Sequence, residues 1–272
     1  MDVSLPDDLA TAPAPPAERP NYWRSGRWLG LLSIFLYFAA WFSITAQGFN
    51  LVRPIKFPSP LMVVEATIRT ADLIPLDALA TVCRVLFGFI VGSALGLGLG
   101  LGMSYNKKIY YFFDPLVESI RPVPVIAMIP FFLMWFGIGE AGKLLLITLG
   151  VFAIIVVSTV EAIRNVPKIY VLAAQTLGAS KLQLFRTVLV PAIVPQLIGP
   201  MRVASALSFT LVVAAEFMGA SAGLGFRILE ARRLFSTDVI MLGVVLIGLL
   251  SAIADALIRR VAAHLTRWSD RA

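Results

Sequence analysis

Long apolar blocks are the feature that most constrains what this chain can fold into. Six blocks predict membrane spans at 28–47, 79–105, 123–137, 143–160, 190–217 and 238–260. A helix needs roughly 20 residues to cross a bilayer, with a usual range of about 17–25. The third block is short for this, unless its helix begins before Pro122 and bends there. The blocks therefore predict an all-α, polytopic membrane protein with about six transmembrane helices.

The overall composition agrees with a membrane protein. Of the 272 residues, 58% are hydrophobic and 14% are charged, and the mean hydropathy is +0.86. A soluble domain usually carries about 25% charged residues. The net charge of +7 comes from Lys and Arg residues that flank the apolar blocks instead of forming one patch. This distribution favours membrane topology over nucleic-acid binding.

The same pattern divides the chain into three regions. Residues 1–27 are rich in Pro, Ala and Asp and are predicted to be a disordered cytoplasmic segment. Residues 28–262 are predicted to form the transmembrane domain, whose first block is too long for the core of a signal peptide and is expected to be retained. Residues 263–272 are predicted to form a cytoplasmic tail. With a single cysteine and a single histidine, neither an intrachain disulfide nor a Cys/His metal cluster is expected.

The distribution of Lys and Arg also predicts the orientation. With six spans and the N-terminus inside, the inside segments hold 14 Lys and Arg residues and the outside segments hold 7. Positive residues are in excess on the cytoplasmic side of membrane proteins. Both termini are therefore predicted to lie in the cytoplasm.

Glycines recur every four residues in the second span, at Gly88, Gly92, Gly96 and Gly100. Residues four apart share one face of a helix, so these four form a groove without side chains. Such a face lets a second helix approach closely. The alternative interpretation is a loosely packed, flexible span, and both interpretations are structural.

The segment Gly137–Leu144 matches both G-x-G-x-x-G and G-x-x-x-x-G-K. A phosphate-binding loop needs Ser or Thr after the Lys and must join a strand to a helix. Here Leu144 follows Lys143, and the segment joins two apolar spans. It is therefore interpreted as a tight turn. The sequence contains no H-E-x-x-H motif, and no catalytic residue or bound cofactor is expected.

Few ionisable residues lie within the predicted spans, among them Arg84, Arg202, Glu216 and Asp255. Charges at membrane depth are costly and usually face the bundle interior or an aqueous path. Arg202 and Glu216 are about four turns apart on one span and cannot pair with each other. A partner on another helix is one interpretation for each. A role in the substrate pathway is the other, and it is strongest for Glu216.

The loop at 161–189 is the longest predicted inside loop and fits two short amphipathic helices around a turn. Pro167 is predicted to start the first helix, Gly178 to end it and Ser180 to cap the second. Ala173 and Ala174 offer a smooth helix face, and Phe185 offers an anchor. Such a rigid loop is interpreted as a docking surface for a soluble partner, against the alternative of a surface loop with ordinary packing.

This loop resembles the EAA loop of bacterial ABC-importer permeases, whose pattern is E-A-A, three residues, Gly and a later Pro. Ala173, Ala174, Gly178 and Pro191 match the pattern, whereas Leu172 stands where the family has Glu. The run Leu177–Ser180, with Gln183 and Phe185, is similar to the nitrate/sulfonate/taurine branch. The resemblance implies that the site residues for docking are Leu172, Ala173, Ala174, Gly178, Ala179, Ser180, Gln183, Phe185 and Pro191.

Two further runs resemble taurine and alkanesulfonate permeases. One lies between Asp114 and Glu140, and the other joins Ala214-Ala215-Glu216 to Gly223-Leu224-Gly225. The resemblance implies a bacterial inner-membrane permease that forms a homodimer with a second copy. It also implies two cytoplasmic ATPase subunits that hold ATP and Mg, and an external substrate-binding protein.

The implied substrate is a small oxyanion such as taurine, an alkanesulfonate or nitrate. An aromatic carboxylate or a thiamine-precursor pyrimidine is the alternative substrate. Two other classes of protein stay open on the residues alone: a membrane-embedded enzyme or assembly factor, and a secondary transporter that works without ATP. The first needs convergent polar groups inside the bundle, and the second favours matching repeats in the two halves.

Overall fold

The computed structural model describes residues 27–45 and 56–266 of the chain. The expectations for residues 1–26 and for 267–272 lie outside the described residues. The chain divides into two compact units, Met1–Val52 and Arg53–Ala272. The first unit contributes α2 (Arg27–Thr45), a helix of 19 residues that is apolar on nearly every side. A helix that is apolar all round belongs in a core or in a membrane.

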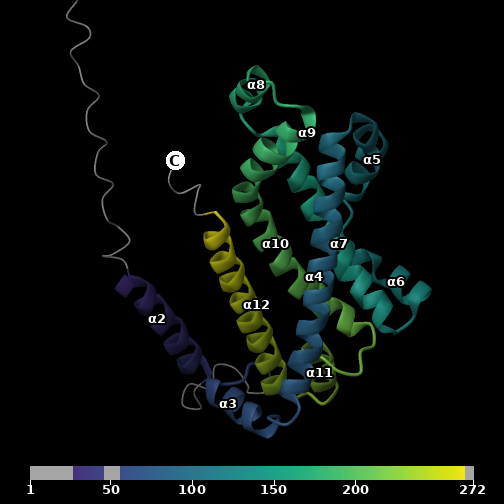
Figure 1. Ribbon diagram of the computed structural model, residues 1–272. Helices are drawn as coiled ribbons and strands as arrows, with labels where there is room; N and C mark the ends of the chain where they lie inside the picture. Colours follow the sequence, from purple (N-terminus) through teal and green to yellow (C-terminus); the bar gives the residue numbers. More distant parts are fainter. Residues whose placement is uncertain (1–26, 46–55, 267–272) are drawn as a thin grey trace, which may run out of the picture. The chain divides into compact units, whose positions relative to one another are not determined.

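The described part of the second unit, residues 56–266, is helical throughout its regular structure, and Figure 1 shows its long helices as a bundle. Its elements follow the chain in this order: α3 (Pro60–Arg69), α4 (Ile74–Tyr105), α5 (Lys107–Ile120), the 3₁₀ turn η2 (Val125–Met128), α6 (Ile129–Phe136), α7 (Glu140–Arg164), α8 (Lys168–Thr176), α9 (Lys181–Gln183), the π-helical turn η3 (Leu184–Leu189), α10 (Val190–Phe217), α11 (Leu224–Arg233) and α12 (Thr237–Leu265).

The described residues contain five helices that are long and apolar enough to cross a membrane. They are Trp28–Thr45, Ile74–Tyr105, Glu140–Arg164, Lys181–Phe217 and Thr237–Leu265. A sixth span is present if Lys107–Ile120 and Val125–Phe136 count as one, with a bend of 86° between them. The predicted all-α membrane fold with about six spans is therefore confirmed.

The third span differs from a simple helix at 123–137. The chain is already helical from Lys107, and it breaks at Pro122 and Pro124 before it continues into η2 and α6. Proline lacks an N–H donor, so two prolines in three residues interrupt the helical hydrogen-bond ladder. The residues between the second and third blocks, which were predicted to lie outside the spans, are mostly α5. The interpretation in which the helix begins before Pro122 and bends there is the correct one.

The helices α4 and α7 lie side by side along most of their length (Figure 1). The four glycines of α4 are buried and face α7. A Cβ added at Gly92 would lie 2.7 Å from the carbonyl oxygen of Thr148, and one added at Gly100 would lie 2.7 Å from Cβ of Thr159. The two backbones therefore approach each other more closely than any larger residue would allow.

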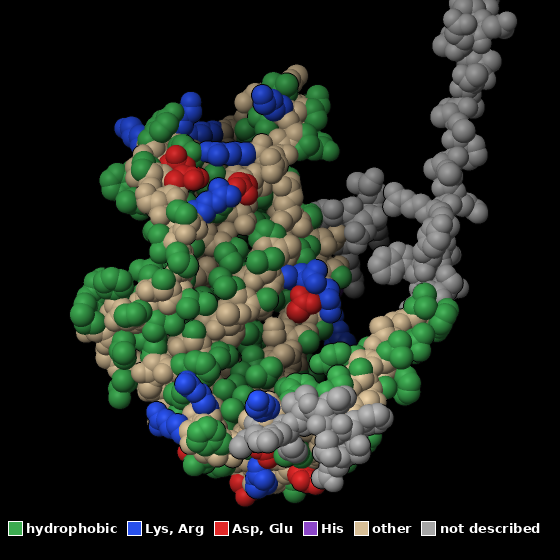
Figure 2. Space-filling model, turned by 180° about the vertical axis from the view of Figure 1, so that it is seen from behind, with side chains coloured by type: hydrophobic (Ala, Val, Ile, Leu, Met, Phe, Trp, Pro, Cys, Tyr) green, Lys and Arg blue, Asp and Glu red, His purple; other side chains and the backbone are tan. Residues whose placement is uncertain are grey.

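The main core lies where α4, α7 and α10 meet. Its fully or almost fully buried members are Val85, Ile147, Val151, Ile155, Ala204, Phe209, Leu211 and Val212. Outside this core, large apolar side chains stay exposed along α4 and α12, including Ile90 and Leu249. Figure 2 shows that the charged side chains gather at the two ends of the bundle, with one mixed cluster between them. An apolar belt between charged ends matches a bilayer.

Replacing Gly92 by Ala is expected to lower the melting temperature of the purified protein. The new methyl group would overlap the α7 backbone, and such overpacking costs about 1–3 kcal/mol. Gly98→Ala is the matched control, because among the described residues no atom lies within 4 Å of a Cβ built at Gly98. That variant should be neutral or slightly more stable, since Ala favours helix over Gly. Equal melting temperatures for the two variants would contradict this account of α4 and α7.

Candidate functional site

A short helical loop stands at one end of the bundle (Figure 1). The helix α8 ends at Thr176, and Gly178, which follows the C-cap residue Leu177, has a φ of +78° in the left-handed region. The N–H of Gly178 donates to the carbonyl of Gln175 at 2.9 Å, and the N–H of Ala179 donates to the carbonyl of Ala174 at 3.0 Å. These two bonds form a Schellman motif, which closes the end of a helix in one defined geometry.

The next turn is fixed by a capping box. The N–H of Gln183 donates to Oγ of Ser180 at 3.3 Å, and the N–H of Ser180 donates to Oε1 of Gln183 at 2.8 Å. This reciprocal pair satisfies donors that a helix start leaves open. The chain then passes through η3 into α10, with Pro191 in the first turn of α10. Loop and span are thus one continuous helical path.

The helix α8 exposes an apolar surface. Leu177 is 87% exposed, and Ile169, Tyr170 and Leu172 are each more than half exposed. Ala173 is exposed as well, while Ala174 and Ala179 are half-buried. Exposed apolar residues grouped on one rigid element are typical of a contact surface for another protein.

Phe185, which was predicted to be an anchor, packs against the end of α4. It is half-buried, and its ring meets the ring of Tyr105 edge-on with 5.1 Å between centroids. Nζ of Lys181 lies 4.6 Å from the centre of the same Tyr105 ring. Tyr105 is the last residue of α4, so these contacts attach the loop to the end of that helix.

The opposite end of the bundle contains a buried network of ion pairs centred on Arg84 of α4. Its guanidinium donates to both carboxylate oxygens of Glu140, at 2.7 and 2.9 Å. It also donates to Oε1 of Glu216 at 2.8 Å and to the carbonyl of Ala222 at 2.7 Å. Arg84 therefore joins α4, α7, α10 and the turn before α11 through charge-assisted hydrogen bonds.

Glu216 is fully buried and accepts three donors. Besides Arg84, these are Oγ1 of Thr81 at 2.8 Å and the N–H of Gly225 at 2.7 Å. Gly223 lies close by with a φ of +131°, and a Cβ there would fall 2.6 Å from Oε2 of Glu216. Glycine at 223 is thus required both by its backbone angle and by the carboxylate beside it.

Two further charges complete the network. Asp77 accepts from the N–H of Gly223 at 2.9 Å and from Nε of Arg227 at 2.8 Å. Nζ of Lys143 is nearly buried and donates to Oε1 of Glu140 at 3.0 Å. Because the two buried cations, Arg84 and Lys143, and the half-buried Arg227 each have a carboxylate partner, the network is close to neutral.

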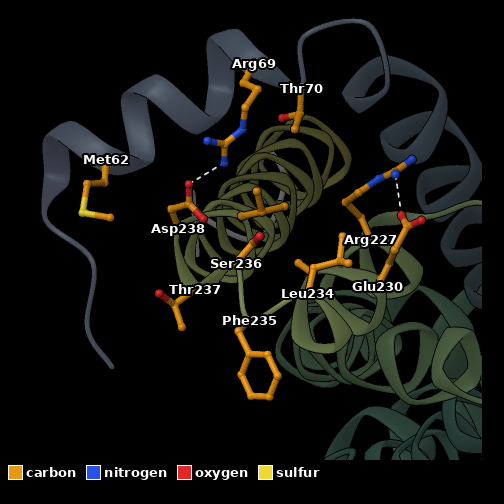
Figure 3. A pocket seen from close by; sticks show the side chains of 12 residues that line it. Met62, Arg69, Thr70, Arg227, Glu230, Leu234, Phe235, Ser236, Thr237 and Asp238 are labelled. Carbon is orange, nitrogen blue, oxygen red and sulfur yellow. Dashed lines mark hydrogen bonds and ion pairs between the residues drawn. The ribbon is translucent and has the colours of Figure 1, made fainter. Parts of the chain in front are cut away.

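A pocket of about 550 Å³ opens beside this network, between α3, α11 and α12 (Figure 3). Arg69 of α3 pairs with Asp238 of α12 across it, and Arg227 pairs with Glu230 within α11. Leu234 and Phe235 follow α11, and the Phe235 ring points away from the pocket. The paired charges leave no net positive charge at the pocket wall, so they do not make it an anion site.

Each of the four span charges named from the sequence has a partner on another helix. Arg84 pairs with Glu216, and Arg202 pairs with Asp255 at 2.6 Å. Arg202 and Glu216 lie in separate clusters, as their spacing predicted. The segment from Gly137 to Leu144 forms a turn into α7, and its Lys143 is engaged by Glu140.

Sequence reasoning missed the roles of Asp77, Lys143 and Arg227, because Asp77 and Arg227 were assigned to segments outside the spans and Lys143 to the first position of one. The available signal was a charged residue directly beside the end of a predicted span, which could have indicated a partner in an ion pair. It also missed α11, which lies inside a segment that was counted as a loop.

Comparisons with known proteins agree with this geometry. Residues 92–270 match the family described as "Binding-protein-dependent transport system inner membrane component". The taurine transport system permease protein TauC of Escherichia coli is 31% identical over 257 residues, which cover 88% of each chain. A Bacillus subtilis protein named aliphatic sulfonates transport permease protein SsuC is 29% identical and covers 93% of this chain and 92% of its own length.

A solved structure shows the same fold. The inward-facing MetNI methionine ABC transporter has a chain that aligns with a TM-score of 0.54 and 22% identity. The alignment covers 75% of this chain and 98% of that chain. At this level of identity the likeness concerns the fold alone.

A bundle of apolar helices of this length defines a polytopic membrane protein. The chain belongs to the family of binding-protein-dependent transport system inner membrane components. Within that family, its relatives include the taurine and aliphatic sulfonate permeases. It is therefore the permease subunit of an ABC importer, and the proteins it resembles are transport permeases and not enzymes.

Proposed function

We propose that this permease carries a small sulfonate, such as taurine, into the bacterial cytoplasm. The observation that supports this substrate is the 31% identity to the taurine permease TauC over 88% of both chains. A relative of Halalkalibacterium halodurans named formylaminopyrimidine transport permease protein ThiX is 28% identical over 80% of this chain. A pyrimidine is therefore the second candidate substrate.

The transport is driven by separate ATPase subunits that dock on the loop from Leu172 to Pro191. The Schellman motif at Gly178 and the capping box at Ser180 support this role, because only a stiff loop transmits motion to the spans. The exposed apolar face of α8 supplies a contact surface. In this proposal ATP and Mg are bound by the ATPase and not by this chain.

The functional unit is a homodimer of this permease with two ATPases and an external binding protein. The Lys and Arg distribution supports an orientation in which the docking loop and both termini face the cytoplasm. The network around Arg84 and the pocket beside α11 then lie toward the outer face. In this arrangement Glu216 stabilises the packing at the outer face and does not bind substrate, because its carboxylate already accepts three hydrogen bonds from the protein.

The substrate is tested by uptake into proteoliposomes that contain the permease purified with its ATPase and binding protein. Labelled taurine, ethanesulfonate, nitrate and formylaminopyrimidine are offered in turn, with ATP inside or absent. ATP-dependent accumulation of taurine or ethanesulfonate is the expected result. Accumulation of the pyrimidine alone would replace the sulfonate with the second candidate.

A further inference from the structure

A second cluster of charges lies between α10 and α12, away from the network around Arg84. Nε of Arg202 donates to Oδ1 of Asp255 at 2.6 Å, and the second guanidinium contact, to Oδ2, is 3.3 Å. Arg259, one turn further along α12, pairs with Oδ2 of Asp255 at 2.8 Å. One carboxylate thus faces two guanidinium groups, which leaves the cluster with one net positive charge.

The cluster lies within the depth of the bilayer. The 29 residues of α12 span roughly 43 Å at 1.5 Å per residue, against roughly 30 Å for the hydrocarbon core. A centred helix therefore extends about 6 Å beyond each side of the core. Asp255 precedes the end of α12 by ten residues, or about 15 Å, which places it about 8 Å inside the core.

The cluster is also open at the surface of the bundle. The side chains of Arg202, Asp255 and Arg259 are 41%, 28% and 54% exposed. The network around Arg84 is the contrast, because the Arg84 and Glu216 side chains are 8% and 0% exposed. An exposed charged cluster at this depth is costly against lipid tails, so water or protein must cover it.

Burying the charged cluster against a second copy of the permease, without water between them, is the less favourable arrangement. A two-fold axis would bring two clusters of net positive charge together without water, and like charges repel strongly where the dielectric constant is low. A water-filled path has the opposite property, since its positive wall raises the local concentration of anions.

We propose that Arg202, Asp255 and Arg259 line the aqueous translocation path and that the two arginines attract the anionic head group of the substrate. Asp255 holds both guanidinium groups in place and keeps the net charge at one, so an anion is attracted without being trapped. The assignment of a sulfonate to this site rests on the proposed function. The positive, water-filled path itself does not depend on which anion is carried.

The path is tested by thiol labelling at Gly199, which lies one turn before Arg202 on the same face of α10. Gly199 is exposed, and among the described residues no atom lies within 4 Å of a Cβ built there. Gly199→Cys is made together with Cys83→Ser, which removes the natural cysteine. The complex with its ATPase is placed in nanodiscs, where both faces are open to reagents.

Two water-soluble methanethiosulfonates are compared, one with a sulfonatoethyl group and one with a trimethylammonioethyl group. Each rate is divided by the rate of the same reagent with a free small thiol. We expect labelling by both, with the anionic reagent faster by roughly tenfold. Absence of labelling, or equal normalised rates, would overturn the proposal.

A charge-neutral variant identifies the source of the preference. Arg259→Gln leaves the pair of Arg202 and Asp255 in place and removes the net charge, so the normalised rates should become nearly equal. Arg260→Gln is the matched control, because it removes the same charge from the adjacent, also exposed position on another face of α12. The control should keep most of the preference, and equal effects of the two variants would contradict the role of Arg259.

Uptake separates this inference from the proposed substrate. In the proteoliposome assay, Arg259→Gln should raise the taurine concentration for half-maximal uptake several-fold, with unchanged assembly. If the natural protein carries no sulfonate at all, the substrate proposal fails. The labelling rates still decide whether the path is filled with water and has a positive electrostatic potential.

Discussion

Replacing Glu216 by Ala is expected to destabilise the protein by about 3–5 kcal/mol, because it leaves a buried guanidinium without one of its two carboxylates. Arg84 would keep Glu140, but the hydroxyl of Thr81 and the N–H of Gly225 would lose their acceptor. Thermal unfolding of the purified protein in detergent measures the effect. We expect a large fall in the melting temperature or loss of folded protein from the membrane.

Glu230→Ala is the control for this prediction. Glu230 also pairs with an arginine, but its side chain is 42% exposed and its partner Arg227 keeps Asp77. Exposed pairs of this kind contribute less than about 1 kcal/mol. If both variants melt at the same temperature as the natural protein, the network around Arg84 does not hold this end of the bundle together.

Replacing Gly178 by Pro is expected to abolish ATP-driven transport while the protein stays in the membrane. Proline fixes φ near −65°, whereas Gly178 has a φ of +78°. It also removes the N–H that donates to Gln175 and so breaks the Schellman motif. The turn between α8 and α9 must then rebuild, and the docking surface changes its direction. Uptake per permease, normalised to the amount in the membrane, measures the result.

The matched variant at this position is Gly178→Asn. Asn tolerates the left-handed region better than other residues with a side chain. No described atom lies within 4 Å of a Cβ at 178, so the added side chain meets no neighbour. We expect this variant to retain most of the transport. Normal uptake by Gly178→Pro at a normal membrane level would refute the docking role of the loop.

Local features of the fold were predictable because short-range chemistry decides them. Ser180 and Gln183 have the spacing of a capping box, and Gly178 follows a helical segment, so the two ends of the loop could be placed. The apolar blocks gave the spans, because a bilayer demands length and apolar character before anything else. The roles of the residues in docking and in packing stay predictions, since measurements of transport and stability must decide them.

Partners across the bundle were not predictable in the same way. Arg84 meets Glu140 and Glu216, which lie 56 and 132 residues away in the chain. The apolar pattern predicts which residues are helical, but it does not predict which helices are neighbours. These pairs could therefore be identified only from the tertiary structure. The bend of 86° between α5 and α6 occurs at two prolines. The sequence predicts a break at these prolines but not the angle between the two helices. The contact of Phe185 with Tyr105 was not predictable either, because Tyr105 lies 80 residues earlier in the chain.

The central claim is that this permease works with an ATPase that docks on the loop at Gly178. The most direct test is ATP hydrolysis by the complex purified gently from the native membrane. We expect an ATPase to co-purify and its hydrolysis to rise when binding protein and taurine are added, and to stay at the basal rate with the Gly178→Pro permease. A permease that purifies without any ATPase and still accumulates substrate without ATP would contradict the claim.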